Sequence, residues 1–298
     1  GIRSASDKES HKLFDIVESF VLPWIVKSTY GSHFPVEGSI DAGKHNINLA
    51  YIVLLLKVHG IKSPDAPVPT EVNLFKQYFD ELGVKLETIA SEVSADAGSV
   101  RSILNEKMRN DKEIEAQLKT IMNVGLMTVR HVLFACLGVL SIDEDLQERL
   151  YTDIIQGSSE RVGKDTLLQF FIAEVLRLLP PSNGAKRVIT EDVVIDGIIF
   201  PKDTEFTVPT YALNRDPKIF PEPTKFSIDR PNLLNNPLFM PFFVGLRDCP
   251  GMQLAERVLR LVITELVRNF RIVAISPPND YQDLIKHIGN LCVKFHRR

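Results

Sequence analysis

The stretch FFVGLRDCPG at residues 242–251 sets a single thiol, Cys249, among two glycines, an arginine and a proline. It is too rich in glycine for a core strand and too apolar for an ordinary surface loop. Packing does not require this arrangement, so the stretch is the first candidate for a functional site.

The chain has three cysteines, Cys136, Cys249 and Cys292, which are too few and too widely spaced for a disulfide framework. Cys136 lies in an apolar helical run and Cys292 in a strand-like run, so both are expected to be small core residues. Cys249 is therefore the candidate reactive or metal-binding thiol.

Length and composition describe an ordinary globular chain of 298 residues, 44% hydrophobic and 24% charged. A net charge of -3, with both signs interspersed, gives no reason to expect nucleic acid or an anionic membrane as a partner. No signal peptide is visible, and the longest apolar runs are about half of the roughly 20 residues that a membrane span needs. The chain as given is expected to be soluble. Its localisation is otherwise unknown, and an upstream membrane anchor is left open for a eukaryotic source.

Apolar periodicity predicts a helical body over 11–160. Its expected helices are at 11–30, 45–59, 70–92 and, as one long helix, at about 112–140. Residues 165–298 then supply a helix stopped by two prolines, an alternating segment with the hairpin signal Asp196-Gly197, a proline-punctuated loop, the Cys249 stretch and a last helix at 252–270. The expected fold is mainly α with a small β region, in one domain over 1–298.

The surroundings of Cys249 suggest its ligand. No CxxC partner or nearby histidine supports a zinc site, whereas one protein ligand suffices when a macrocycle supplies four, as in haem. The positive end of the following helix favours the thiolate. Gly245 and Gly251 let the backbone approach a flat ligand, Arg247 can reach a carboxylate on its rim, and Phe242 can keep water from the sulfur.

The pattern Phe242-x-x-Gly245-x-Arg247-x-Cys249-x-Gly251 is similar to the haem-binding signature of the cytochrome P450 family. The resemblance implies a haem-thiolate domain that binds haem b, with Cys249 as the axial ligand of the iron.

Three further positions carry the resemblance. Glu174 and Arg177 resemble the family's Glu-x-x-Arg helix, which implies a structural network. On residues alone they are a surface ion pair. FPEPTKF at 220–226 resembles the loop that supplies the network's third member, with Lys225 where arginine is commonest, so no bidentate fork is expected from it. Arg187 matches a position that usually meets a haem propionate. The alternative interpretation of Arg187 is a solvated charge at a strand edge.

The run VGLMT at 124–128 corresponds to the family's Ala-Gly-x-acid-Thr run over the distal haem face. The resemblance implies that Gly125 leaves room for a ligand and that Thr128 keeps a catalytic hydroxyl. Met127 replaces the acid, which puts the usual proton relay in doubt.

Two polar residues lie near this run. Asn123 is a candidate for the missing relay, and His131 is expected to be a satisfied or exposed helix histidine. Residues 123–128, 181–188 and 286–292 are expected to line the substrate pocket.

The specific resemblance covers about 120–298, and residues 11–110 fit only as generic helices. Family members usually begin with a hundred or more further residues, including a helix whose Trp holds the other propionate. Trp24 is not in such a setting. We therefore expect an N-terminally incomplete fold, completed by a missing segment or a partner chain. Residues 13–31 faintly resemble the haem-thiolate domain of fungal dioxygenase fusions that rearrange fatty-acid hydroperoxides.

The resemblance implies an oxidoreductase of the monooxygenase type that oxidises an apolar small molecule or lipid. An external redox partner would supply electrons, since no GxGxxG motif is present. The alternative is a hydroperoxide isomerase or peroxygenase acting on fatty-acid hydroperoxides, which Met127 favours because a peroxide needs no acid–Thr relay. A second alternative is a haem-binding module that needs a partner chain and is not an enzyme alone. The substrate, the redox partner and the oligomeric state are left open.

Overall fold

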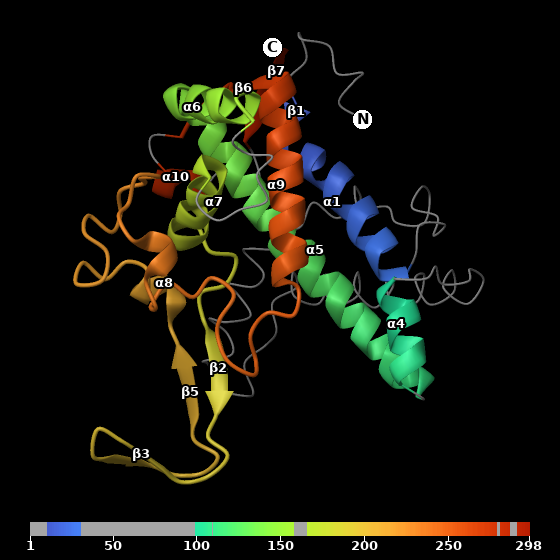
Figure 1. The fold of residues 1–298 in the computed structure, drawn as a ribbon, viewed down its shortest axis with the longest axis vertical. Coiled ribbons are helices and arrows are strands. Elements are labelled where there is room, and N and C mark those ends of the chain that lie inside the picture. The colour runs from blue at the N-terminus through green and yellow to red at the C-terminus, as the bar shows by residue number, and fades with distance from the viewer. Residues whose placement is uncertain (1–10, 31–98, 109, 158–165, 279–280, 287–290) are drawn as a thin grey trace, which may run out of the picture. The chain divides into compact units, whose positions relative to one another are not determined.

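The computed structural model describes residues 11–30, 99–108, 110–157, 166–278, 281–286 and 291–298 (Figure 1). The helices expected at 45–59 and 70–92 lie outside these residues. The described helices are α1 Leu13–Tyr30, α4 Val100–Lys107, α5 Asp111–Ile142, α6 Glu144–Ile155, α7 Leu167–Leu178, α8 Thr210–Leu213, the 3-10 helix η4 Leu233–Asn235, α9 Met252–Asn269 and α10 Tyr281–Lys286. The described strands are β1 His11–Lys12, β2 Ala185–Val188, β3 Val193–Ile195, β4 Ile198–Phe200, β5 Glu205–Val208, β6 Phe270–Ala274 and β7 Cys292–Arg297. The expectation of a mainly α fold with a small β region is confirmed.

The chain divides into two compact units, one of residues 18–127 and one of residues 1–17 with 128–298. The boundary falls inside α5, between Met127 and Thr128. Each unit is described by itself below. The expectation of a single domain stays a prediction.

In the unit of residues 18–127, the first half of α5 and α1 bury apolar side chains. Val21 and Ile25 of α1 and Met122 of α5 are buried. Gly125 lies against α1, because a Cβ atom added to it would come 2.8 Å from the Ile25 Cδ1 atom. That atom is the flexible end of the Ile25 side chain and could shift, so the packing alone does not require glycine, and the ligand-space role of Gly125 stays a prediction.

The unit that contains residues 128–298 has its buried side chains on the second half of α5 and on α6, α7 and α9, among other elements. Residues 132–141 of α5 and 171–179 in and just after α7 are buried throughout. Among the described residues, α5 is the one helix long and apolar enough to cross a membrane. Its apolar window is 72% buried, however, as in the core helix of a globular protein.

The ends of these helices follow local sequence signals. Asp143 caps α6 by accepting a hydrogen bond of 2.9 Å from the Leu146 N–H, and Thr166 caps α7 by accepting one of 3.2 Å from the Gln169 N–H. The helix that two prolines were expected to stop is thus α7, which ends before Pro180 and Pro181.

Three small antiparallel sheets complete the described fold. Strands β1, β7 and β6 form one, β2 pairs with β5, and β3 pairs with β4. Figure 1 shows β2 and β5 side by side, leading to the β3–β4 hairpin. Asp196 and Gly197 both have positive φ, 51° and 78°, between the paired residues Ile195 and Ile198. This confirms the hairpin that Asp-Gly predicts.

A buried glutamine joins the sheet to the helices. The Gln147 amide nitrogen donates to the Leu140 and Ile272 carbonyl oxygens, both at 2.9 Å. Its amide oxygen accepts from the Ile272 N–H at 2.7 Å. Gln147 therefore pairs with both backbone polar groups of Ile272 in β6, as a neighbouring strand would.

Candidate functional site

The loop that precedes α9 carries Cys249 and is closed by its own backbone. The Cys249 N–H donates to the Phe242 carbonyl at 2.9 Å, and the Asp248 N–H donates to the Gly245 carbonyl at 3.2 Å. Gly245 has φ of 86°, a conformation that side chains with a Cβ atom rarely adopt. The glycine of the motif is therefore required by the turn that presents the thiol.

The Cys249 thiol is exposed, whereas Cys136 is buried and Cys292 is half-buried in β7. Cys136 lies in the core, as expected, and its burial raises the pKa of its thiol. A Cβ atom on Gly251 would lie 3.9 Å from the Cys249 sulfur, which is an ordinary van der Waals contact, so the expected role of Gly251 in the approach of a flat ligand stays a prediction. Of the three cysteines, Cys249 is the one available to a ligand.

Arg187 of β2 reaches this loop. Its Nη2 donates to the Arg247 carbonyl at 3.2 Å, its Nη1 donates to the Lys186 carbonyl at 2.9 Å, and its guanidinium lies 5.4 Å from the centroid of the Phe243 ring. The structure thus brings together Arg187 and the Cys249 loop, 60 residues apart in sequence. Because β2 belongs to a two-stranded sheet and both hydrogen bonds are exposed, the propionate role of Arg187 and the alternative of a solvated charge at a strand edge both stay predictions.

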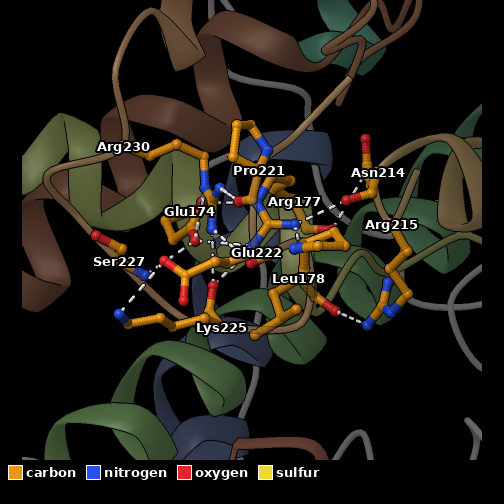
Figure 2. Close-up of polar contacts among 11 residues, drawn as sticks. Glu174, Arg177, Leu178, Asn214, Arg215, Pro221, Glu222, Lys225, Ser227 and Arg230 are labelled. Atoms are coloured by element: carbon orange, nitrogen blue, oxygen red, sulfur yellow. Dashed lines mark hydrogen bonds and ion pairs between the residues drawn. The ribbon is translucent and has the colours of Figure 1, made fainter. Parts of the chain in front are cut away.

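A buried carboxylate organises the segment that leads to the loop (Figure 2). Glu174 and Arg177 of α7 both have 0% exposure. Arg177 donates to Glu174 through Nε at 2.7 Å and through Nη2 at 2.8 Å, which is a bidentate pair. The pair is therefore internal and not the surface ion pair that the local pattern alone suggests.

The third cation of this network is Arg230, and the expectation of Lys225 in that place is wrong. Arg230 Nε lies 3.2 Å from each carboxylate oxygen of Glu174, and Arg230 is 7% exposed (Figure 2). The Lys225 ammonium instead pairs at 3.5 Å with Glu222 on the surface. Lys225 takes part only through its carbonyl, which accepts from Arg177 at 3.2 Å and from Arg230 at 2.8 Å.

The network holds the proline-punctuated loop through its backbone. Arg177 also donates at 2.7 Å to the Asn214 and Pro223 carbonyls, and Arg230 donates to the Pro221 and Glu222 carbonyls. Two guanidinium groups share one carboxylate, so these carbonyls help to stabilise the surplus positive charge. Arg230 lies five residues after Lys225, outside the seven-residue stretch FPEPTKF that carries the resemblance. The local sequence therefore did not mark Arg230 as the third cation.

The expected distal residues all lie on α5, on both sides of the unit boundary. Thr128 is half-buried and belongs to the unit that holds Cys249, whereas Asn123, Gly125 and Met127 belong to the other unit. The side chain of Asn123 is outside the described residues. Catalytic roles for Asn123, Gly125 and Thr128 therefore stay predictions.

His131, one turn beyond Thr128, is a satisfied helix histidine. Burial lowers its pKa to about 4, partly offset by a hydrogen bond with the backbone of Leu179, and Arg130 lowers the pKa further. The imidazole is therefore uncharged near neutral pH.

The expected pocket lining stays a prediction. It comprises residues 123–128, 181–188 and 286–292, of which 287–290 are not described. In the part of the chain that the structure describes, no group of three or more His, Cys, Asp or Glu side chains could hold a metal ion. A metal at Cys249 would need ligands from outside these side chains, and the chemistry of a single thiolate suits haem.

Comparison with known proteins decides the family. A family model described as Cytochrome P450 matches residues 74–294, which is most of the chain. The chain belongs to the cytochrome P450 family. Membership implies haem iron with a cysteine thiolate as its axial ligand, and the exposed Cys249 thiol, just before the N-terminal end of α9, fits that group.

Several curated proteins are similar to more than half of this chain. Cytochrome P450 3A13 of Mus musculus is 33% identical over 180 residues, covering 56% of this chain and 36% of its own length. Cytochrome P450 3A6 of Oryctolagus cuniculus is 34% identical over 182 residues, covering 57% and 36%. The mitochondrial sterol 26-hydroxylase of Mus musculus is 30% identical over 223 residues, covering 68% and 42%. The chain thus spans less than half the length of these relatives.

Proposed function

We propose that this chain is the haem-thiolate part of an oxidoreductase of the monooxygenase type, with Cys249 as the axial ligand. The observation that carries the proposal is the exposed Cys249 thiol, in a loop that is closed by the Phe242 carbonyl and braced by Arg187. When bound, haem supplies the activation of dioxygen or of a peroxide and the oxidation of the substrate.

Cys249 and two arginines bind and orient the group. Cys249 provides the anionic sulfur at the positive N-terminal end of α9. Arg187 uses two of its five N–H donors on backbone carbonyls, which leaves three for a propionate. Arg247, exposed in the same loop, offers a second fork to the rim of the ring. Phe242 is half-buried, and its proposed role is to keep water from the sulfur when the group is bound.

The Glu174 network acts at a distance from the chemistry. It fixes the loop of residues 214–230 against α7, and that loop leads to the Cys249 stretch. Its role is to hold the haem-binding segment in one conformation, so Glu174, Arg177 and Arg230 are structural residues in this proposal.

The substrate is proposed to be an apolar small molecule or lipid. A relative named sterol 26-hydroxylase, similar over 68% of this chain, supports an apolar substrate class. Electrons come from an external redox partner in this proposal.

The reduced protein with bound carbon monoxide should absorb near ~450 nm, which is the sign of thiolate ligation. Cys249→Ser should abolish this band, whereas Cys292→Ser, which removes a half-buried thiol from β7, should keep it. A Cys249→Ser protein that still absorbs at this wavelength would refute the ligand assignment.

A second candidate function is a hydroperoxide isomerase or peroxygenase, and Met127 favours it. A carboxylate at position 127 would pass a proton from solvent towards the Thr128 hydroxyl, and methionine cannot. A peroxide brings its own O–O bond and needs no such relay. A preparation that binds haem but turns over neither peroxide nor dioxygen would favour the remaining alternative, a module that needs a partner chain.

A further inference from the structure

The hairpin of β3 and β4 exposes apolar side chains on both of its faces (Figure 1). Val194 and Ile199, which lie opposite each other on one face, are 64% and 68% exposed. Ile195 and Ile198, the pair that closes the turn, lie on the other face and are also exposed. Valine and isoleucine favour strands that pack against a neighbour, so this hairpin is suited to a partner.

The outer edge of β4 carries backbone groups that point away from β3. In the described part of the chain this sheet has two strands, which pair Val193 with Phe200 and Ile195 with Ile198. In an antiparallel ladder the pair that closes a two-residue turn exchanges both hydrogen bonds, and the next pair exchanges none. The N–H and C=O groups of Ile199 therefore point outwards, where another strand can bind them.

The charges of the hairpin decide which edge suits a second copy of this chain. Antiparallel pairing of two β4 strands about Ile199 sets Asp196 of each copy opposite Lys202 of the other, and both residues are exposed. The same pairing of two β3 strands about Val194 would set Asp192 opposite Asp196. Like charges in opposite positions destabilise a sheet, and unlike charges stabilise it. The β4 edge is therefore complementary to itself, and the β3 edge is not.

We propose that two copies of this chain associate through β4 and form one sheet in the order β3-β4-β4-β3. The contact is closed, since each copy offers the same edge to the other. Pro201 has no N–H to donate, so it ends the ladder after Phe200 and keeps the pairing in one register. Because a strand of three residues is short for a stable interface of ~1,200 Å² or more, the dimer is weak, with a dissociation constant on the order of 100 μM.

A membrane surface is the other partner that an apolar hairpin suggests, and the charges of this hairpin oppose it. Asp196 is exposed at the tip, and Glu191 and Asp192 are exposed at the base. Insertion of the tip into hydrocarbon would carry a carboxylate with it, which is costly. Pairing of two copies instead sets the Asp196 carboxylate beside a lysine.

The first test is sedimentation velocity of the whole chain of 298 residues, from ~10 to ~500 μM. The parent protein should shift from monomer to dimer over this range. A parent that stays monomeric would overturn the proposal. Species larger than a dimer would overturn it too, because they would show an open-ended assembly in which a β3 edge meets a β4 edge. The measurement needs neither haem nor turnover, so its outcome is independent of the proposed function.

Ile199→Lys and Val194→Lys form a matched pair of variants. The two positions are opposite each other on one face and are similarly exposed, so the two substitutions should affect the fold alike. Ile199→Lys places two ammonium groups opposite each other and should weaken the dimer by about tenfold or more, whereas Val194→Lys, on the outer strand, should keep it. Equal loss of the dimer in both variants would show contact through the face of the hairpin and would overturn pairing through the β4 edge.

A charge reversal tests the register. Lys202→Glu sets a carboxylate opposite Asp196 at both ends of the contact and should weaken the dimer about tenfold. The backbone N–H of residue 202, which donates to Asp192 at 2.7 Å, is kept. Adding Asp196→Asn removes the repulsion with a residue that tolerates the positive φ of 51° at this turn, so it should restore most of the dimer. A double variant as weak as Lys202→Glu would contradict the proposed pairing.

If the lysine variants do not fold, amide hydrogen exchange of the parent protein decides. Exchange of the Ile199 N–H should slow as the concentration rises from ~10 to ~500 μM, whereas exchange of the Val194 N–H, on the other edge of the hairpin, should not change. Equal exchange of the Ile199 N–H at both concentrations would overturn the proposal. Binding of the parent to phosphatidylcholine vesicles, lost in both lysine variants, would show a lipid surface as the partner and would overturn it as well.

Discussion

The Nε atom of Arg230 lies 3.2 Å from both carboxylate oxygens of Glu174, and Glu174 is also the bidentate partner of Arg177. One buried carboxylate therefore faces two guanidinium groups, whose remaining donors bind backbone carbonyls of the loop at 214–225. Removing Glu174 would leave two buried guanidinium groups without an anion, whereas removing one arginine leaves the carboxylate paired with the other.

Arg230→Ala should destabilise the folded protein by about 1–3 kcal/mol, because its loss leaves the Pro221 and Lys225 carbonyls without this donor while Arg177 still pairs with Glu174. The measurement is the free energy of unfolding from urea denaturation, with Lys225→Ala as the matched control. Lys225→Ala should have little effect, because its ammonium is exposed and its carbonyl is retained. The reverse order of effects would show that Lys225 is the third cation after all.

Glu174→Ala should reduce both the yield of folded protein and haem incorporation, because it leaves two buried arginines without an anion. Haem content per folded protein is measured by pyridine haemochrome absorbance. Normal haem content combined with altered product distribution would contradict a structural role for Glu174.

Arg187→Met should speed the loss of haem on the order of tenfold, because a charge-assisted hydrogen bond to a propionate disappears. Transfer of haem to excess apomyoglobin gives the rate. Lys186→Met, at the adjacent exposed residue that pairs with Glu205, is the control and should behave like the parent. Equal haem loss from Arg187→Met and the parent protein would exclude Arg187 from the haem site.

Met127→Glu should raise the fraction of reducing equivalents that appear in product when dioxygen and a reductase drive turnover, because a carboxylate can relay a proton to Thr128. The unchanged protein should turn over readily with cumene hydroperoxide and leak hydrogen peroxide with dioxygen. Met127→Leu serves as the control for volume. Efficient dioxygen-driven turnover by the parent protein, unaffected by Thr128→Ala, would mean that another group carries the proton.

Lowering the pH from 6.5 to 4 should cost about 3 kcal/mol of stability through His131. Its pKa is about 4 in the folded protein and near 6.5 in the unfolded chain, so the unfolded chain binds the extra proton first. The contribution is fully present above pH 6.5 and falls as the pH drops towards 4. Urea denaturation across this range should show a shallower slope for His131→Leu than for the parent, and parallel slopes would contradict a buried neutral histidine.

Some of this protein follows from local sequence alone. The glycine at 245 is needed for a positive φ, Asp196-Gly197 makes its hairpin, and two prolines stop α7, because backbone preferences act within a few residues. The turn around Cys249 is also determined locally, since it is closed by backbone hydrogen bonds within the motif. The family, the mainly helical fold and the candidate thiol could therefore be predicted.

Tertiary structure decided the partners that lie far apart in the chain. Arg230 meets Glu174 across 56 residues, and Arg187 meets Arg247 across 60. Gly125 fits against Ile25 on another helix. Lys225 and Arg230 are both cations on one loop, and only the course of that loop's backbone decides which of them turns inward. Local pattern contains no information on that choice, because burying a guanidinium depends on carbonyls that the fold brings together.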